Sequence, residues 1–121
     1  MQQKPTILVV DDDQPIVTLM RKLLAEFGFE AVTAMSGAEA LEAARNHPPA
    51  LVLLDKNMPG MSGAEVSLAL RAEPGLESIP ILILSGESMS KRELEAMKAD
   101  GAVMKPFDVM GLVEEIRRRL G

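Results

Sequence analysis

Acidic residues follow two apolar segments of the chain, and together they could bind a metal ion. Asp11, Asp12 and Asp13 directly follow the first apolar run, and Asp55 directly follows a later one. Carboxylates held close together repel one another, so their clustering is costly unless a hard cation neutralises it. Mg²⁺ is the natural candidate, because it prefers oxygen ligands and usually binds through one or two carboxylates plus phosphate oxygens.

A hydroxyl group and an ammonium group follow two further apolar runs. Ser85 ends the fourth run, and Lys105, followed by Pro106, ends the fifth. Such a set suits phosphoryl transfer, in which a protein mostly positions groups and neutralises charge on the phosphoryl oxygens. The chain has no cysteine, and its one histidine, His47, lies beside Pro48 at the far end of a predicted helix. A carboxylate is therefore the best candidate nucleophile.

The elements that would position these residues alternate between strands and helices. Apolar runs predict five strands, at Thr6–Val10, Glu30–Ala34, Ala50–Leu54, Pro80–Leu84 and Ala102–Met104. The alternation predicts an α/β, doubly wound fold with a parallel sheet covered by helices on both faces. Ligands of such sheets bind at the carboxyl ends of the strands, where the strand order reverses. Periodicity alone does not fix that order, although right-handed crossovers restrict it.

Helices are predicted from apolar residues at a spacing of 3.6. An apolar stripe on the first helix and another on the last should face the sheet. The first stripe consists of Ile16, Leu19, Met20, Leu23, Leu24 and Phe27, and the last of Val109, Leu112, Val113, Ile116 and Leu120. Helix starts are indicated by capping-box spacing at Ser36 with Glu39, Ser62 with Glu65 and Ser90 with Glu93, and by Asp108. Gly28 and Gly75 mark helix ends.

Four segments resemble the motifs of one family. They read Ile-Leu-Val-Val-Asp-Asp-Asp, Leu-Asp-Lys-Asn-Met-Pro-Gly-Met-Ser-Gly, Leu-Ser-Gly and Met-Lys-Pro-Phe, and each ends a predicted strand. In order and spacing they are similar to the motifs of response-regulator receiver domains, the chemotaxis-regulator-like family of two-component signalling. The resemblance spans essentially the whole chain. It implies a flavodoxin-like (βα)5 fold with a central sheet of order 2-1-3-4-5.

The resemblance also implies a metal site and an acceptor. Asp55 would be the phosphoacceptor, and Mg²⁺ would be held by Asp11, Asp12, Asp55 and the backbone carbonyl of Asn57. In the order 2-1-3-4-5 the first and third strands are neighbours, which would bring the acids together as the charge argument requires. Asp13 is interpreted instead as a turn residue or helix cap.

The same resemblance assigns the remaining site residues and the partners. Ser85 would donate to one phosphoryl oxygen and Lys105 would contact another. The phosphoryl donor would be a phosphohistidine of a sensor histidine kinase or phosphotransfer protein, or a small donor such as acetyl phosphate. The chain would act as a signalling switch and not as an enzyme, catalysing only its own aspartyl phosphorylation and dephosphorylation. Receivers usually carry Tyr or Phe where this chain has Ala102, so the route to its downstream partner is expected to differ.

Composition restricts the remaining possibilities. A net charge of −5 and a pI near 4.9 argue against direct nucleic-acid binding, which needs a basic face. No apolar run is long enough for a membrane span or signal peptide, and no cysteine is present, so a cytoplasmic location is expected. No long linker interrupts residues 1–121, which predicts a single domain. With the resemblance, this implies a single receiver domain without an effector domain.

Three other interpretations remain. Asp11-x-Asp13 after a strand also resembles the nucleophile motif of haloacid-dehalogenase phosphatases, but their additional acidic motif after a later strand has no counterpart here. The chain could instead be a scaffold that keeps the fold without phosphate control. It could also be a receiver fragment of a larger hybrid kinase or transcription factor.

Overall fold

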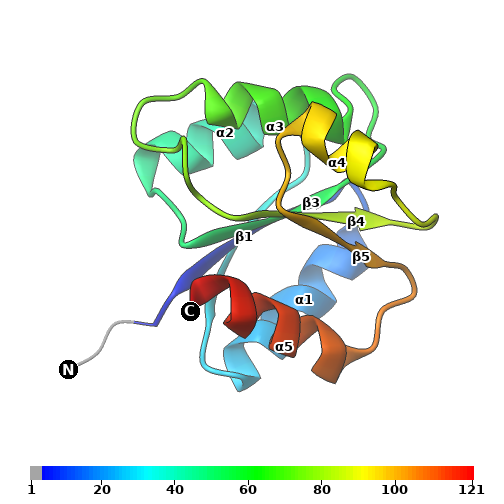
Figure 1. The fold of residues 1–121 in the computed structure, drawn as a ribbon. Helices are drawn as coiled ribbons and strands as arrows, with labels where there is room; N and C mark the ends of the chain where they lie inside the picture. Colours follow the sequence, from blue (N-terminus) through cyan, green and yellow to red (C-terminus); the bar gives the residue numbers. More distant parts are fainter. Residues whose placement is uncertain (1–3) are drawn as a thin grey trace.

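Five parallel strands form one sheet between two layers of helices in the computed structural model, which describes residues 4–121 (Figure 1). The elements in chain order are β1 Thr6–Val10, α1 Gln14–Glu26, β2 Glu30–Ala34, α2 Gly37–Asn46, β3 Leu51–Asp55, α3 Gly63–Arg71, β4 Ile81–Ser85, α4 Lys91–Met97, β5 Gly101–Met104 and α5 Val109–Leu120. The strands lie in the order β2-β1-β3-β4-β5. This confirms the doubly wound α/β fold and the order 2-1-3-4-5.

Each face of the sheet carries its own core. Helices α2, α3 and α4 cover one face, and α1 and α5 cover the other (Figure 1). Alternate residues of each central strand point to opposite faces, so Leu8 and Val10 of β1 enter the first core while Ile7 and Val9 enter the second. Strands β3 and β4 are buried at every position, which explains why their sequences are almost continuously apolar.

The predicted boundaries of three strands were wrong by one residue. Strands β3 and β4 each begin and end one residue later than predicted, and β5 begins at Gly101. The ladder continues past the last apolar residue because backbone hydrogen bonds do not depend on side-chain polarity: Asp55 pairs with Leu84, and Ser85 pairs with Met104. As a result, two of the polar site residues belong to strands and are held by the sheet itself.

The prediction for the first helix was partly wrong. Leu19 was expected to face the sheet but is 51% exposed, whereas Val17, outside the predicted stripe, is buried with Met20 and Leu24. Residues 17, 20 and 24 follow the helical repeat, and position 19 lies almost opposite position 17. The stripe on α5 was correct, with Leu112, Val113 and Ile116 buried and its two end residues partly buried.

The helix caps were largely predicted correctly. Full capping boxes form at Ser62 and Ser90, and the carboxylate of Asp108 caps α5. At Ser36 only half of the box forms, because the Glu39 side chain accepts from the backbone N–H of Met35 at 3.2 Å instead of from that of Ser36. Gly28 follows the end of α1, and Gly75 lies in the turn after α3; both have a φ of 88°. Along residues 4–121, none of the helices has the length and hydropathy needed to span a membrane.

Candidate functional site

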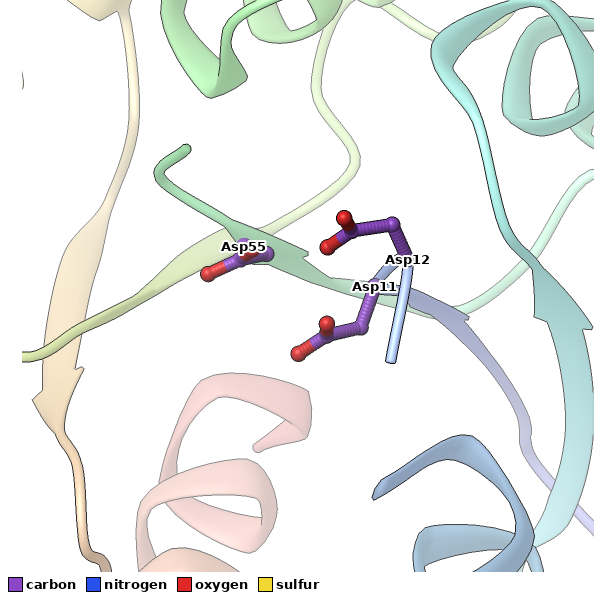
Figure 2. A group of neighbouring side chains, drawn as sticks. All are labelled: Asp11, Asp12 and Asp55. Carbon is purple, nitrogen blue, oxygen red and sulfur yellow. The ribbon is translucent and has the colours of Figure 1, made fainter. Parts of the chain in front are cut away.

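Three carboxylates meet at the carboxyl end of the sheet. Strand β1 pairs with β3 so that Val10 lies beside Leu54, which makes the next residues, Asp11 and Asp55, neighbours. Asp11, Asp12 and Asp55 each offer an oxygen atom, and these three atoms all lie within 4.8 Å of one another (Figure 2). Asp11 and Asp55 are buried, with 1% and 8% exposure, while Asp12 faces solvent. The predicted acid cluster therefore exists.

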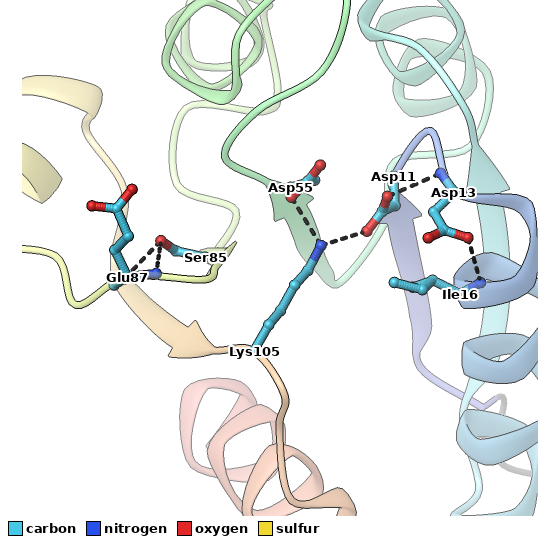
Figure 3. Close-up of polar contacts among 7 residues, drawn as sticks. All are labelled: Asp11, Asp13, Ile16, Asp55, Ser85, Glu87 and Lys105. Atoms are coloured by element: carbon cyan, nitrogen blue, oxygen red, sulfur yellow. Dashed lines mark hydrogen bonds and ion pairs between the residues drawn. The ribbon is translucent and has the colours of Figure 1, made fainter.

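The chain after β1 turns sharply and holds Asp11 in place. The backbone N–H of Asp11 donates to the carbonyl of Ala34 on β2 at 3.1 Å, and the side-chain Oδ1 of Asp11 accepts from the N–H of Asp13 at 3.0 Å. The carboxylate of Asp13 in turn accepts from the N–H of Ile16 and caps α1 (Figure 3). Asp13 is thus a helix cap, as the sequence indicated.

Lys105 reaches into the acid cluster from the end of β5. Its ammonium Nζ lies 3.0 Å from Asp11 Oδ2 and 3.0 Å from Asp55 Oδ1, so it bridges the two buried carboxylates (Figure 3). The backbone N–H of Lys105 donates to the carbonyl of Ser85 at 2.7 Å and extends the β4–β5 pairing. The ammonium of Lys105 therefore pairs with two buried carboxylates, and the exposed carboxylate of Asp12 lies in the same cluster.

The cluster carries excess negative charge. Burial raises the pKa of Asp55, the hydrogen bond from Lys105 lowers it, and the charges of Asp11 and Asp12 raise it further, with a net increase. Burial lowers the pKa of Lys105, but its contacts with Asp11 and Asp55 outweigh burial and raise it. The pKa values of Asp55 and Lys105 are both raised, because a proton bound at either group reduces the excess negative charge.

The donor set fits Mg²⁺. Its carboxylate oxygens are hard ligands, they are close enough to share one ion, and they hold more negative charge than Lys105 can neutralise. The exposed Asp12 leaves the site open to solvent, and Mg²⁺ keeps several waters when it binds to proteins. Asn57, whose carbonyl was predicted as a further ligand, lies in the exposed loop two residues after Asp55.

The hydroxyl of Ser85 is turned toward the loop after β4. Its Oγ donates to the carbonyl of Glu87 at 2.7 Å and accepts from the N–H of Glu87 at 3.1 Å (Figure 3). Ser85 is at the carboxyl edge as predicted, but its hydroxyl is occupied by Glu87. Serine often bonds the backbone two residues ahead in turns. Because this is common, the sequence alone did not single out the contact with Glu87.

Gly63 lets α3 begin close to the backbone of Asp55, a role that the sequence did not indicate. The N–H of Gly63 donates to the carbonyl of Lys56 at 2.8 Å. A Cβ atom on Gly63 would lie 2.6 Å from the carbonyl oxygen of Asp55, too close for any other residue without a shift. The closeness of α3 thus constrains where β3 ends.

Comparisons with known proteins agree with this geometry. Residues 7–117 match the family model of the response regulator receiver domain. The chain belongs to this family. The sequence of this receiver domain is 37% identical over 113 residues to the transcriptional regulatory protein KdpE of Mycobacterium tuberculosis, covering 92% of this chain and 49% of KdpE. It is 39% identical over 116 residues to the DNA-binding response regulator MtrA of Mycolicibacterium smegmatis, covering 94% and 50%.

Solved structures of receivers share the fold. The chemotaxis protein CheY4 of Vibrio cholerae superposes with a TM-score of 0.91 at 33% identity, covering 95% of this receiver domain and 98% of CheY4. The chain spans about half the length of the curated relatives it matches. It is a receiver domain of two-component response regulators, which receive phosphoryl groups from histidine kinases. The phosphatase interpretation is therefore not favoured.

Proposed function

We propose that Asp55 is the phosphoryl acceptor of this receiver domain and that its phosphorylation switches the binding of a partner protein. The supporting observation is the position of Asp55, buried at the end of β3, paired with Lys105 and adjacent to two further carboxylates. A carboxylate in this setting can act as a nucleophile toward phosphorus.

The reaction would transfer a phosphoryl group from a phosphohistidine of a sensor histidine kinase or a phosphotransfer protein. An oxygen of Asp55 forms a bond to phosphorus, the phosphorus–nitrogen bond breaks, and the electron pair of that bond stays on the imidazole nitrogen. Lys105, freed from Asp55, can pair with a phosphoryl oxygen while it keeps its contact with Asp11. The chain would catalyse only its own phosphorylation and dephosphorylation.

Mg²⁺ would be held by the carboxylates of Asp11, Asp12 and Asp55 and by the backbone carbonyl of Asn57. When bound, it would neutralise negative charge on the phosphoryl oxygens and the surrounding acids. Asp11 is fixed by its contact with the N–H of Asp13, so the chain itself sets the position of one ligand before any ion arrives.

The switch would begin at Ser85. To donate to a phosphoryl oxygen, its hydroxyl must leave Glu87, which frees the loop from Gly86 to Ser90 and the start of α4 to move. Ala102 is exposed on β5 and has no ring that could change position, so we expect β5 to stay nearly fixed. The partner protein would then bind to α4 and the adjoining loop.

The proposed context is a cytoplasmic phosphorelay. Residues 1–121 would act as one receiver domain, without direct contact to nucleic acid or membrane. The curated relatives include DNA-binding regulators about twice as long, so a receiver half of such a regulator is the second context to test. In both contexts the output would depend on Asp55.

Intact-mass measurement after incubation with acetyl phosphate tests the proposal. The wild-type chain should gain one phosphoryl group in the presence of Mg²⁺ and little in EDTA, and Asp55→Asn should gain none. Asp13→Asn is the matched control, because asparagine also caps helices and this change removes a neighbouring acid outside the cluster. A wild-type chain that gains no mass, or an Asp55→Asn variant labelled as fully as wild type, would refute the proposal.

A further inference from the structure

An ion pair joins the residue after Asp55 to the first turn of α4. Nζ of Lys56 lies 3.5 Å from Oε2 of Glu93, and the two side chains are 25% and 48% exposed. Oε1 of the same carboxylate accepts from the N–H of Ser90 at 3.2 Å and completes the capping box of α4. The hydrogen bond from Ser90 and the charge of Lys56 hold the pKa of Glu93 below its ordinary value. Glu93 therefore links the cap of α4 to the end of β3.

The other end of α4 is anchored by one buried hydrogen bond and by contacts of Arg71. The hydroxyl of Ser67, which is fully buried, donates to the carbonyl of Met97 at 2.7 Å. Nε of Arg71 donates to the carbonyl of Lys98 at 2.9 Å, and the same guanidinium pairs with Asp100 at 2.8 Å. The end of α4 near Met97 is thus held by α3, whereas its first turn is held by exposed groups.

The first turn of α4 lies over a groove. A cavity of about 300 Å³ separates α4 from the loop between β3 and α3. Both partners of the ion pair line it, as do Ala96 and Met97 at the other end of the helix, and Met97 is the one buried residue of α4. In the first turn Leu94 packs against the core while residues 91–93 are exposed, so the polar contacts of Glu93 contribute to the position of this turn.

The loop before α4 connects this turn to Ser85. Residues 86–89 lie between Ser85, at the end of β4, and the cap residue Ser90. The hydroxyl of Ser85 bonds both backbone groups of Glu87 within that loop. The N–H of Lys56 donates to the carbonyl of Leu84 at 2.9 Å, so both ends of the connection start from adjacent strands. Only a short segment therefore separates Ser85 from the cap residue of α4.

We propose that the Lys56–Glu93 ion pair is a latch that holds the first turn of α4 in its resting position. Movement of Ser85 toward a modified Asp55 draws the loop with it and opens the latch, while α4 pivots about its anchored end at Ser67 and Arg71. The inference rests on the proposed function of Asp55. Since the latch must open for activation, it opposes activation, and its loss favours the activated conformation.

The latch is expected to adjust the switch and not to control it alone. A half-exposed ion pair contributes little free energy, so its loss should shift the equilibrium between the resting and activated conformations by about two- to five-fold. Salt should weaken it, because exposed charges are screened.

Three variants and one control test the latch. Lys56→Met and Glu93→Gln each break the ion pair, the double variant does so without changing the net charge, and Gln at position 93 can still accept from the N–H of Ser90. Glu95→Gln, an exposed acid on the same helix, is the matched control. Two properties are measured: hydrogen exchange at residues 91–94 in the unmodified protein, and the affinity for beryllofluoride in the presence of Mg²⁺.

The double variant should exchange faster at residues 91–94 and bind beryllofluoride about two- to five-fold more tightly than wild type, and high salt should remove the difference. The effects of the two single variants should sum to more than the effect of the double variant, because each single change already breaks the same contact. Unchanged exchange and unchanged affinity in the double variant would overturn the latch while leaving the proposed function intact. Failure of the wild-type chain to bind beryllofluoride would refute the proposed function and the coupling that rests on it.

Discussion

Replacing Lys105 with methionine should destabilise the metal-free fold at neutral pH. The change removes an ammonium that lies 3.0 Å from both Asp11 and Asp55 and leaves those buried carboxylates beside Asp12 without this cation. Breaking a buried ion pair by removing one partner costs about 3–5 kcal/mol. Lys105 is 25% exposed and Asp55 can take up a proton, so we expect a loss of about 2 kcal/mol in the free energy of unfolding.

The deficit of Lys105→Met should shrink in acid. Burial raises the folded-state pKa of Asp55, and the hydrogen bond from Lys105 opposes that increase, so the pKa rises further without Lys105. A carboxyl with a raised folded-state pKa favours the fold below its unfolded pKa, and this contribution is lost as pH rises through the folded-state value. The stability of Lys105→Met should therefore be close to that of wild type in acid, and its deficit should be largest once Asp55 is ionised.

Urea unfolding followed by far-ultraviolet circular dichroism measures this loss, since the chain has no Trp or Tyr for fluorescence. Lys22→Met, an exposed lysine on α1, is the control for removal of one positive charge. Mg²⁺ should stabilise Lys105→Met more than wild type, because it binds the folded acid cluster. Equal stability of Lys105→Met and wild type near neutral pH in EDTA, or a deficit that grows in acid, would refute the reasoning.

Three further substitutions have defined expectations. Asp12→Ala should stabilise the metal-free fold by about 1 kcal/mol by relieving repulsion and should abolish the rise in melting temperature with Mg²⁺; a loss of metal-free stability would make Asp12 a structural residue. Gly63→Ala should cost about 1–3 kcal/mol in urea unfolding, because its Cβ would lie 2.6 Å from the Asp55 carbonyl oxygen, while Gly86→Ala, with open space around it, should be nearly neutral. Lys98→Gly should gain about 1 kcal/mol in the same assay, since Lys98 has a φ of 57° at the end of α4; a decrease would mean that its side chain contributes more than the strain costs.

The fold could be predicted from the sequence because its signals are local. Apolar runs and capping residues mark the strands and helices, and the parallel sheet then brings the last residues of β3 and β4 and the residues after β1 and β5 to one edge. Asp11 and Asp55 meet because their strands are neighbours. That order came from the family resemblance and not from periodicity, since apolar spacing shows which residues are buried but not which strands pair.

The features missed by the sequence depend on tertiary contacts. The Ser85 hydroxyl bonds Glu87 because the loop after β4 bends back, and Gly63 is required because α3 starts against β3. Lys56 and Glu93 are 37 positions apart and are joined only when α4 folds over the loop after β3. Leu19 is exposed because the sheet contacts α1 along a narrower face than its apolar residues cover.

Chemical trapping of the phosphorylated residue tests the central claim most directly. An acyl phosphate on an aspartate is reduced by borohydride to homoserine, which marks the acceptor permanently. After incubation with acetyl phosphate and Mg²⁺, reduction and peptide mapping should find homoserine at position 55. Homoserine at position 11, 12 or 13, or a phosphoryl group retained on Ser85, would contradict the assignment of Asp55 as the acceptor.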